Sequence, residues 1–170
     1  MNILFLAPRL PWPADTGGKI RTLNILKQLI KKINVHLVSF SFEAKDQQWA
    51  QELKALGVKV TLVPLKNHNL FAKIIGILIK PIPYSMLKYQ SPGMTRTLLT
   101  INQAEKFDAV HVDHLHMAHY CSCFPHLPCI LDEHNVEYKI LERCVPVEKS
   151  FLKKLVFKNQ ALKMKKFEAN

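Results

Sequence analysis

The amino-acid sequence predicts an α/β fold, a single Rossmann-like domain built on a parallel sheet. Short apolar runs that are typical of buried strands alternate with stretches whose apolar residues recur at helical spacing. The length of 170 residues fits one domain, and a composition of 48% hydrophobic and 22% charged residues fits an ordinary folded core. Strands that alternate with helices pair in parallel, and ligands then bind beyond the carboxyl ends of the strands.

Continuous apolar runs predict the strands, because a strand buried on both faces of a sheet has no polar side to show. The expected strands lie over residues 3–7, 35–40, 58–63, 108–113 and 128–132. A loop with three prolines follows the first strand and ends at the adjacent glycines Gly17 and Gly18. The last strand is expected to be buried and ends in the polar run from Asp132 to Asn135.

Helices are expected where apolar residues recur three or four positions apart. These stretches lie over residues 19–32, 44–56, 94–106 and 136–167, with shorter candidates at 70–79 and 115–124. Gly57 closes the second of these helices as a C-cap, and Pro146 is expected to break the long C-terminal stretch.

The net charge of +11 suggests an anionic partner: nucleic acid, a membrane surface or phosphate groups. No helix-turn-helix, zinc-finger or aromatic RNA-binding signature is present, and the lysines are dispersed, so no nucleic-acid partner is expected. The N-terminal apolar run lacks a basic lead-in and stops at Pro8, so no signal peptide is expected. No apolar stretch approaches the ~20 residues of a membrane span. A cytoplasmic location with reduced cysteines follows as the expectation.

Two segments that bring lysines and apolar side chains together are candidates for peripheral contact with the inner face of a membrane. Residues 70–79 are apolar and flanked by Lys66 and Lys80, and the C-terminal helix interleaves lysines with apolar side chains. For the C-terminal helix the favoured alternative is that its apolar stripe packs on the sheet while its lysines are solvated.

The glycine pair stands where the first helix is expected to begin. Backbone amides at a helix N-terminus attract anions, and glycine allows a ligand to approach the chain closely. Lys19 and Arg21 follow in the first turn, where a cation opposes the helix dipole unless something negative binds there. Neither a G-x-G-x-x-G nor a Walker motif is present, and a flexible turn with solvated charges is the competing interpretation.

The polar run after the fifth strand is well placed to bind a substrate. Glu133, His134 and Asn135 follow the strand end, and an imidazole can donate, accept or shuttle a proton. The competing interpretation is a helix N-terminus, with Asn135 as the cap and Glu137 favouring the dipole.

A cluster of histidines and cysteines near the fourth strand raises the question of zinc. Its members are His111, His114, His116, His119, Cys121 and Cys123. His111 lies within an expected strand and His114 beyond its end, so these ligands need not converge. No Cys-x-x-Cys or His-Glu-x-x-His motif is present either, so no metal is expected. Asp113, His114 and His116 are expected to line a cleft at the strand end, while His119 and the cysteines pack or lie in a loop.

Three segments, residues 3–21, 110–114 and 131–138, together resemble the family-4-type retaining glycosyltransferases of the GT-B fold. The resemblance covers essentially the whole chain and is strongest to bacterial sugar transferases of exopolysaccharide and envelope glycan assembly. It implies that the chain is the N-terminal, acceptor-side half of a GT-B fold, in which two Rossmann-like domains face a cleft and the second domain binds the nucleotide sugar.

The resemblance also implies roles for single residues. Gly17 and Gly18, with Lys19 and Arg21 beside them, are expected to contact the donor phosphate and sugar. His134 is the expected catalytic residue, which hydrogen-bonds the transferring sugar, with His114 as the alternative. The acceptor side is expected to include Asp113, His114, Glu133 and Asn135.

The resemblance is to an enzyme larger than this chain. Neither a donor-binding domain nor a Glu-x7-Glu motif in a suitable context lies before Asn170. The chain is therefore expected to be incomplete and inactive alone. Since fixed cations can stabilise the leaving nucleotide diphosphate and no Asp-x-Asp motif is present, no cofactor or metal is expected. The alternatives are a standalone, non-catalytic binding module and half of a GT-B-type nucleotide-sugar epimerase.

Overall fold

The chain folds around a single five-stranded sheet in which all paired strands run parallel, in the order β3-β2-β1-β4-β5. The structure is a computed structural model that describes residues 1–65, 77 and 79–169. The strands are β1 (Asn2–Ala7), β2 (Asn34–Ser41), β3 (Lys59–Pro64), β4 (Ala109–Asp113) and β5 (Cys129–Asp132). The predicted α/β, Rossmann-like fold is confirmed.

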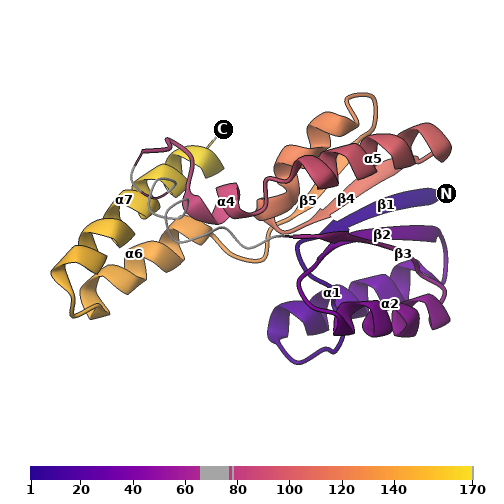
Figure 1. Cartoon of the computed structure of the whole chain (residues 1–170), viewed down its shortest axis with the longest axis horizontal. Helices are drawn as coiled ribbons and strands as arrows, with labels where there is room; N and C mark the ends of the chain where they lie inside the picture. The colour runs from indigo at the N-terminus through magenta and orange to yellow at the C-terminus, as the bar shows by residue number, and fades with distance from the viewer. Residues whose placement is uncertain (66–76, 78, 170) are drawn as a thin grey trace. The chain divides into compact units, whose positions relative to one another are not determined.

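Helices cover both faces of the sheet. They are α1 (Gly17–Leu29), α2 (Lys45–Ala55), α5 (Pro92–Ala104) and the 3-10 helix η1 (Leu115–Cys123). Figure 1 shows α1 and α2 on one face and α5 on the other. The central strand β1 is fully buried at Leu4, Phe5 and Leu6, because it has strands on both sides and helices on both faces.

On the face covered by α1 and α2, a core of apolar side chains joins the strands to the helices. It includes Phe5 from β1, Leu37 from β2, Leu23 and Leu26 from α1 and Leu53 from α2. This packing fixes α1 against the sheet, which places the start of α1 beyond the carboxyl end of β1.

The helix α1 begins at Gly17 rather than at the expected Lys19 and ends at Leu29. The glycine pair therefore belongs to the first turn of the helix, and the amide of Ile20 donates to the carbonyl of Thr16 at 2.9 Å. The other expected boundary glycine, Gly57, has φ +96° and follows Leu56, which is the C-cap of α2, so Gly57 closes the helix one residue beyond the expected cap position.

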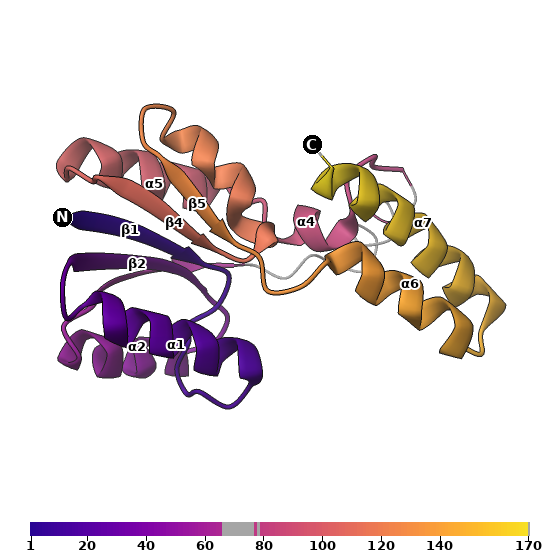
Figure 2. The same ribbon diagram turned by 180° about the vertical axis from the view of Figure 1, so that it is seen from behind.

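The prediction that the last strand is buried is wrong. Within the described sheet β5 pairs with β4 alone, and it forms the edge seen in Figure 2. Ile130 is 53% and Leu131 43% exposed. An apolar run records the hydrophobicity of a strand but not its place in the strand order, which explains the error.

The chain divides into two compact units, and the sheet belongs to the first, residues 1–66 and 91–134. The second unit, residues 67–90 and 135–170, contains α4 (Tyr84–Lys88), α6 (Glu137–Val147) and α7 (Phe151–Glu168). Within it the side chain of Gln160 accepts from the amide of Tyr84 at 2.8 Å and donates to the carbonyl of Ile77 at 3.1 Å.

The lysine-rich C-terminal segment forms α7, and Pro146 lies in the last turn of α6, so the expected break falls just after it. Phe151, Leu152 and Leu162 are exposed, so the favoured packing of the apolar stripe on the sheet is wrong for these side chains. The other candidate for membrane contact, residues 70–79, lies almost entirely outside the described residues. None of the described helices combines the length and the apolar character needed to span a membrane.

Candidate functional site

The carboxyl ends of β4 and β5 meet the first turns of α1 at one end of the sheet. Asp113 is the last residue of β4 and is paired in register with Asp132, the last residue of β5. Thr22 and Arg21 of α1 reach these two carboxylates across 91 and 111 residues of sequence. Because the strands run parallel, their carboxyl ends lie at the same end of the sheet, and polar side chains at these strand ends are brought close together.

Asp113 is the buried centre of this site, with only 4% of its surface exposed. Its Oδ2 accepts a hydrogen bond from Thr22 Oγ1 at 2.9 Å, and its Oδ1 lies 2.9 Å from His134 Nε2. Thr22 Oγ1 is also 3.0 Å from the carbonyl of Gly18, so the threonine ties the carboxylate to the start of α1. A buried carboxylate held from two sides has a fixed orientation.

His134 lies over the glycine pair. A Cβ built on Gly18 would stand 3.6 Å from His134 Nδ1, whereas a Cβ on Gly17 would meet nothing within 4 Å. The N-cap residue Thr16 makes no side-chain capping hydrogen bond, and the first turn contains no acidic residue. The amides at the start of α1 thus receive no side-chain cap from Thr16. They lie beside an imidazole, and the two glycines place no Cβ in front of them, so this position suits an anionic ligand.

The two expected cations beside the glycines are each paired with an acidic side chain. Lys19 Nζ is 2.9 Å from Asp15, and this hydrogen bond lowers the pKa of the Asp15 carboxyl. Arg21 Nη2 is 2.5 Å from Asp132 Oδ1. Arg21 is half-exposed, and a ligand with more negative charge can therefore recruit it without breaking the fold.

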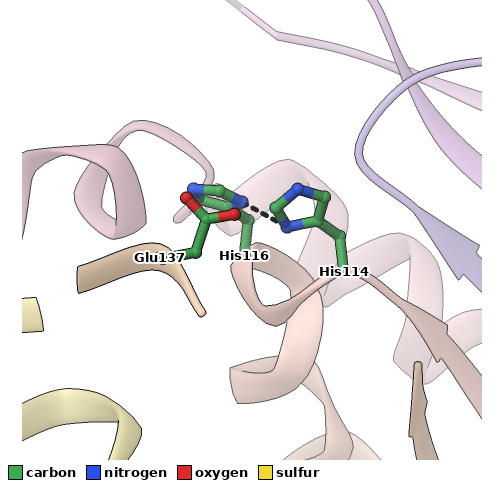
Figure 3. A group of neighbouring side chains, drawn as sticks. All are labelled: His114, His116 and Glu137. Atoms are coloured by element: carbon green, nitrogen blue, oxygen red, sulfur yellow. Dashed lines mark hydrogen bonds between the residues drawn. The ribbon is translucent and has the colours of Figure 1, made fainter. Parts of the chain in front are cut away.

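His114 adopts a backbone conformation that is rare for a residue with a side chain, with φ +91°. Its amide donates to the carbonyl of Asp132 at 3.0 Å, which extends the ladder between β4 and β5. Figure 3 shows its ring facing that of His116, with the two Nδ1 atoms 2.6 Å apart. Glu137, also labelled there, belongs to the second unit.

The surroundings of His114 favour the neutral form of its ring. The centroid of the His114 ring is 5.3 Å from that of His134. Burial lowers the pKa of His114, and the nearby His134 lowers it further, while Asp113 acts in the opposite direction. Since one hydrogen must join the two Nδ1 atoms of His114 and His116, one ring donates and the other accepts.

His111 belongs to the same edge and lies on the same side of β4 as Asp113. Its ring stacks on Phe5 with centroids 4.4 Å apart, its Nε2 is buried without a hydrogen-bond partner among the described residues, and burial lowers its pKa. One nitrogen of His111 and one oxygen each of Asp113 and Asp132 lie within 4.8 Å of one another. These donor types suit a divalent cation, but Arg21 already neutralises Asp132, so a cation would have to compete with the guanidinium.

The remaining expected site residues are placed less centrally. Glu133 is exposed at the end of the first unit, and Asn135 is exposed at the start of the segment that leads to α6. The helix α6 begins at Glu137 with Val136 as its N-cap, so the interpretation of Asn135 as the cap is wrong. Thr22 was missed by the sequence analysis, although its position one turn after Gly18 was a usable signal.

His119, Cys121 and Cys123 lie on the 3-10 helix η1. Burial raises the pKa of Cys121 to about 12, with a further contribution from Cys129, and burial also raises that of Cys123. These groups are thiols at neutral pH, which disfavours a nucleophilic role.

Comparison with known proteins yields no match to this chain, neither a family model, nor a curated protein, nor a solved structure.

Proposed function

We propose that the chain is the N-terminal, acceptor-side part of a retaining glycosyltransferase that uses a nucleotide sugar and serves cell-surface polysaccharide or glycolipid assembly. The observation that carries the proposal is the position of His134 over Gly18 at the start of α1, with Asp113 behind the ring. Residues 3–21 and 131–138, two of the segments that resemble the glycosyltransferases, thus lie in contact. The third segment, residues 110–114, supplies the buried carboxylate of Asp113.

The chemistry of such a transfer matches what this edge offers. When the bond between sugar and phosphate breaks, negative charge grows on the leaving diphosphate, and preorganised amide dipoles at a helix N-terminus stabilise it. The imidazole of His134 can form a hydrogen bond with a hydroxyl group of the sugar beside that phosphate. In this proposal the rest of the donor site comes from a second domain, so the 170-residue chain binds but does not turn over.

A titration followed by nuclear magnetic resonance tests the binding half of the proposal. Uridine and guanosine diphosphates and their sugar conjugates are added to the 15N-labelled chain. We expect the amide signals of Gly17, Gly18 and Lys19 to shift together. The same titration of His134→Ala should keep the response to the diphosphate but lose the additional response to the sugar. A nucleotide diphosphate that leaves the amides at the start of α1 unmoved contradicts the proposal.

A turnover assay separates the proposed half-enzyme from other functions. We expect no release of nucleotide diphosphate from any nucleotide sugar by the chain alone. Release without an acceptor points to an epimerase-like or hydrolytic enzyme, and release with an acceptor shows a complete transferase. Either result overturns the role that the proposal assigns to a second domain.

Peripheral association with the cytoplasmic face of a membrane is part of this proposal. Support comes from the second unit, where the exposed Phe151 and Leu152 of α7 stand between Lys149 and Lys153. Flotation with vesicles of anionic lipid at low and high salt tests it, with neutral vesicles and the variant Phe151→Ser/Leu152→Ser as controls. Absence of binding to anionic vesicles at low salt refutes this part alone.

A further inference from the structure

We propose that Asp113 is a positioning residue that sets which ring nitrogen of His134 carries the proton. In this arrangement the proton is on Nε2, and Nδ1 accepts a hydrogen bond from an uncharged hydroxyl group of the ligand. The identity of that group as a sugar hydroxyl rests on the proposed function. The tautomer and its control by Asp113 do not.

The hydrogen bonds around Asp113 determine where the proton lies. Thr22 has one hydroxyl hydrogen and two acceptors, Gly18 O at 3.0 Å and Asp113 Oδ2 at 2.9 Å. If Asp113 is ionised, the hydroxyl donates to Oδ2. If Asp113 is protonated on Oδ2, it donates to the hydroxyl, which then donates to Gly18.

In both cases Oδ1 of Asp113 remains an acceptor for His134 Nε2, 2.9 Å away. With Asp113 ionised or protonated on Oδ2, the hydrogen between these two atoms comes from the imidazole. A hydrogen on Oδ1 would reverse this bond and leave the imidazole hydrogen on Nδ1, which is the outcome that overturns the proposal. Both side chains are largely removed from water, with 11% of His134 and 5% of Asp113 exposed, so solvent does not supply a competing partner. The contact thus selects the tautomer with the hydrogen on Nε2.

The opposite nitrogen then has a defined chemical preference. With the hydrogen on Nε2, Nδ1 presents a lone pair toward Gly18, 3.6 Å from where a Cβ would stand. A phosphate oxygen is also an acceptor and gains nothing there, whereas a hydroxyl donates to the lone pair. The start of α1 and His134 therefore recognise different parts of one ligand: the amides take the anion and the imidazole takes a hydroxyl.

Nitrogen-detected resonances of the imidazole test the tautomer directly in the labelled chain, without any ligand. We expect the His134 ring to show a protonated Nε2 and an unprotonated Nδ1. In Asp113→Asn the side-chain amide offers both a donor and an acceptor, so we expect a measurable population with the hydrogen on Nδ1. A wild-type ring that carries its hydrogen on Nδ1 overturns the proposal, and so does an unchanged tautomer in a folded Asp113→Asn variant.

Asp46→Asn is the matched control. Asp46 is as buried as Asp113, and its Oδ2 accepts from the amides of Phe42 and Glu43 at 2.6 and 3.1 Å, away from the site. It should leave the His134 ring resonances unchanged. A wild-type ring that carries its hydrogen on Nδ1 overturns the proposal even if Asp113→Asn does not fold.

Two probes test the preference for a hydroxyl. A methyl glycoside at high concentration should move the Nδ1 resonance of His134, and inorganic pyrophosphate should move the amides of Gly17 and Gly18 but not Nδ1. A response of Nδ1 to pyrophosphate alone overturns the preference, as does a glycoside without effect. If the tautomer is as proposed but neither probe nor any nucleotide sugar binds, the glycosyltransferase proposal fails while the positioning role of Asp113 stands.

Discussion

Replacement of Gly18 by alanine should make the chain more stable and its ligand binding weaker. The backbone at Gly18 is helical, and an added Cβ would meet its nearest neighbour, His134 Nδ1, at 3.6 Å, which is ordinary van der Waals contact. The methyl group therefore costs no strain in the folded chain. It does cover the nitrogen that we assign to the ligand.

The two effects have separate magnitudes. Alanine restricts the unfolded chain more than glycine does, which adds about 0.4–1 kcal/mol to the free energy of unfolding. For a chain of this size that raises the melting temperature by roughly 1–4 °C. Loss of a hydrogen bond from a hydroxyl to Nδ1 removes about 0.5–1.5 kcal/mol of binding, which weakens a sugar ligand by up to about tenfold.

Thermal unfolding and the titration described above measure both effects on the same sample. Gly57→Ala is the comparison, because a Cβ there would meet nothing within 4 Å but φ is +96°. It should lower the free energy of unfolding by about 1–2 kcal/mol, since the left-handed conformation penalises a side chain. A lower melting temperature for Gly18→Ala would refute the reasoning, because it would mean that the ring and the helix start cannot accept a methyl group.

Three further predictions concern Thr22, the buried histidines and the cysteines. Thr22→Val removes the hydroxyl that bonds Asp113 and should cost about 1.5–3 kcal/mol in urea unfolding, whereas Thr22→Ser should recover most of it; equal losses for the two variants would contradict this role. Burial lowers the pKa values of four histidines below the ordinary 6.5, namely His36, His111, His114 and His119, so the unfolded chain binds more protons than the folded chain. The free energy of unfolding is therefore highest above about pH 6.5 and falls as the pH decreases below it. Urea unfolding between about pH 7.5 and about pH 5.5 checks this, and a flat profile would speak against it. With a thiol reagent at mildly alkaline pH, the exposed Cys129 should react before Cys121, whose pKa burial raises to about 12; modification of Cys121 first, located by mass spectrometry, would be the opposite outcome.

Sequence patterns predicted the parts of the fold that depend on local chemistry. The run from Ile3 to Ala7 can only be satisfied by burial on both faces, and Gly57 marks a φ that other residues avoid, so both were predictable. The order of the strands depends on pairing between remote segments. Apolar side chains alone therefore could not reveal that β5, with Ile130 and Leu131, forms the edge.

The candidate site shows the same division. The rule that ligands bind beyond the carboxyl ends of parallel strands directed attention to Gly18, Asp113 and His134 before their contacts were known. The contacts themselves join residues far apart in the chain, and a single threonine in a helix is commonly an ordinary surface or core residue. Thr22 acquires its importance from Asp113, which is 91 positions away, and no local pattern contains that information.

The central position of β1 has a consequence for the order of events in folding. Its pairing with β4 closes a loop of about a hundred residues, and until that closure the first turns of α1 and the end of β4 are not neighbours. The hydrogen bond from Thr22 to Asp113 is thus among the contacts that form only after β1 and β4 have paired. A molecule that bridges Gly18 and His134 would select the completed sheet over every partly opened state. It should slow hydrogen exchange throughout β1 and β4, far beyond the residues that it touches.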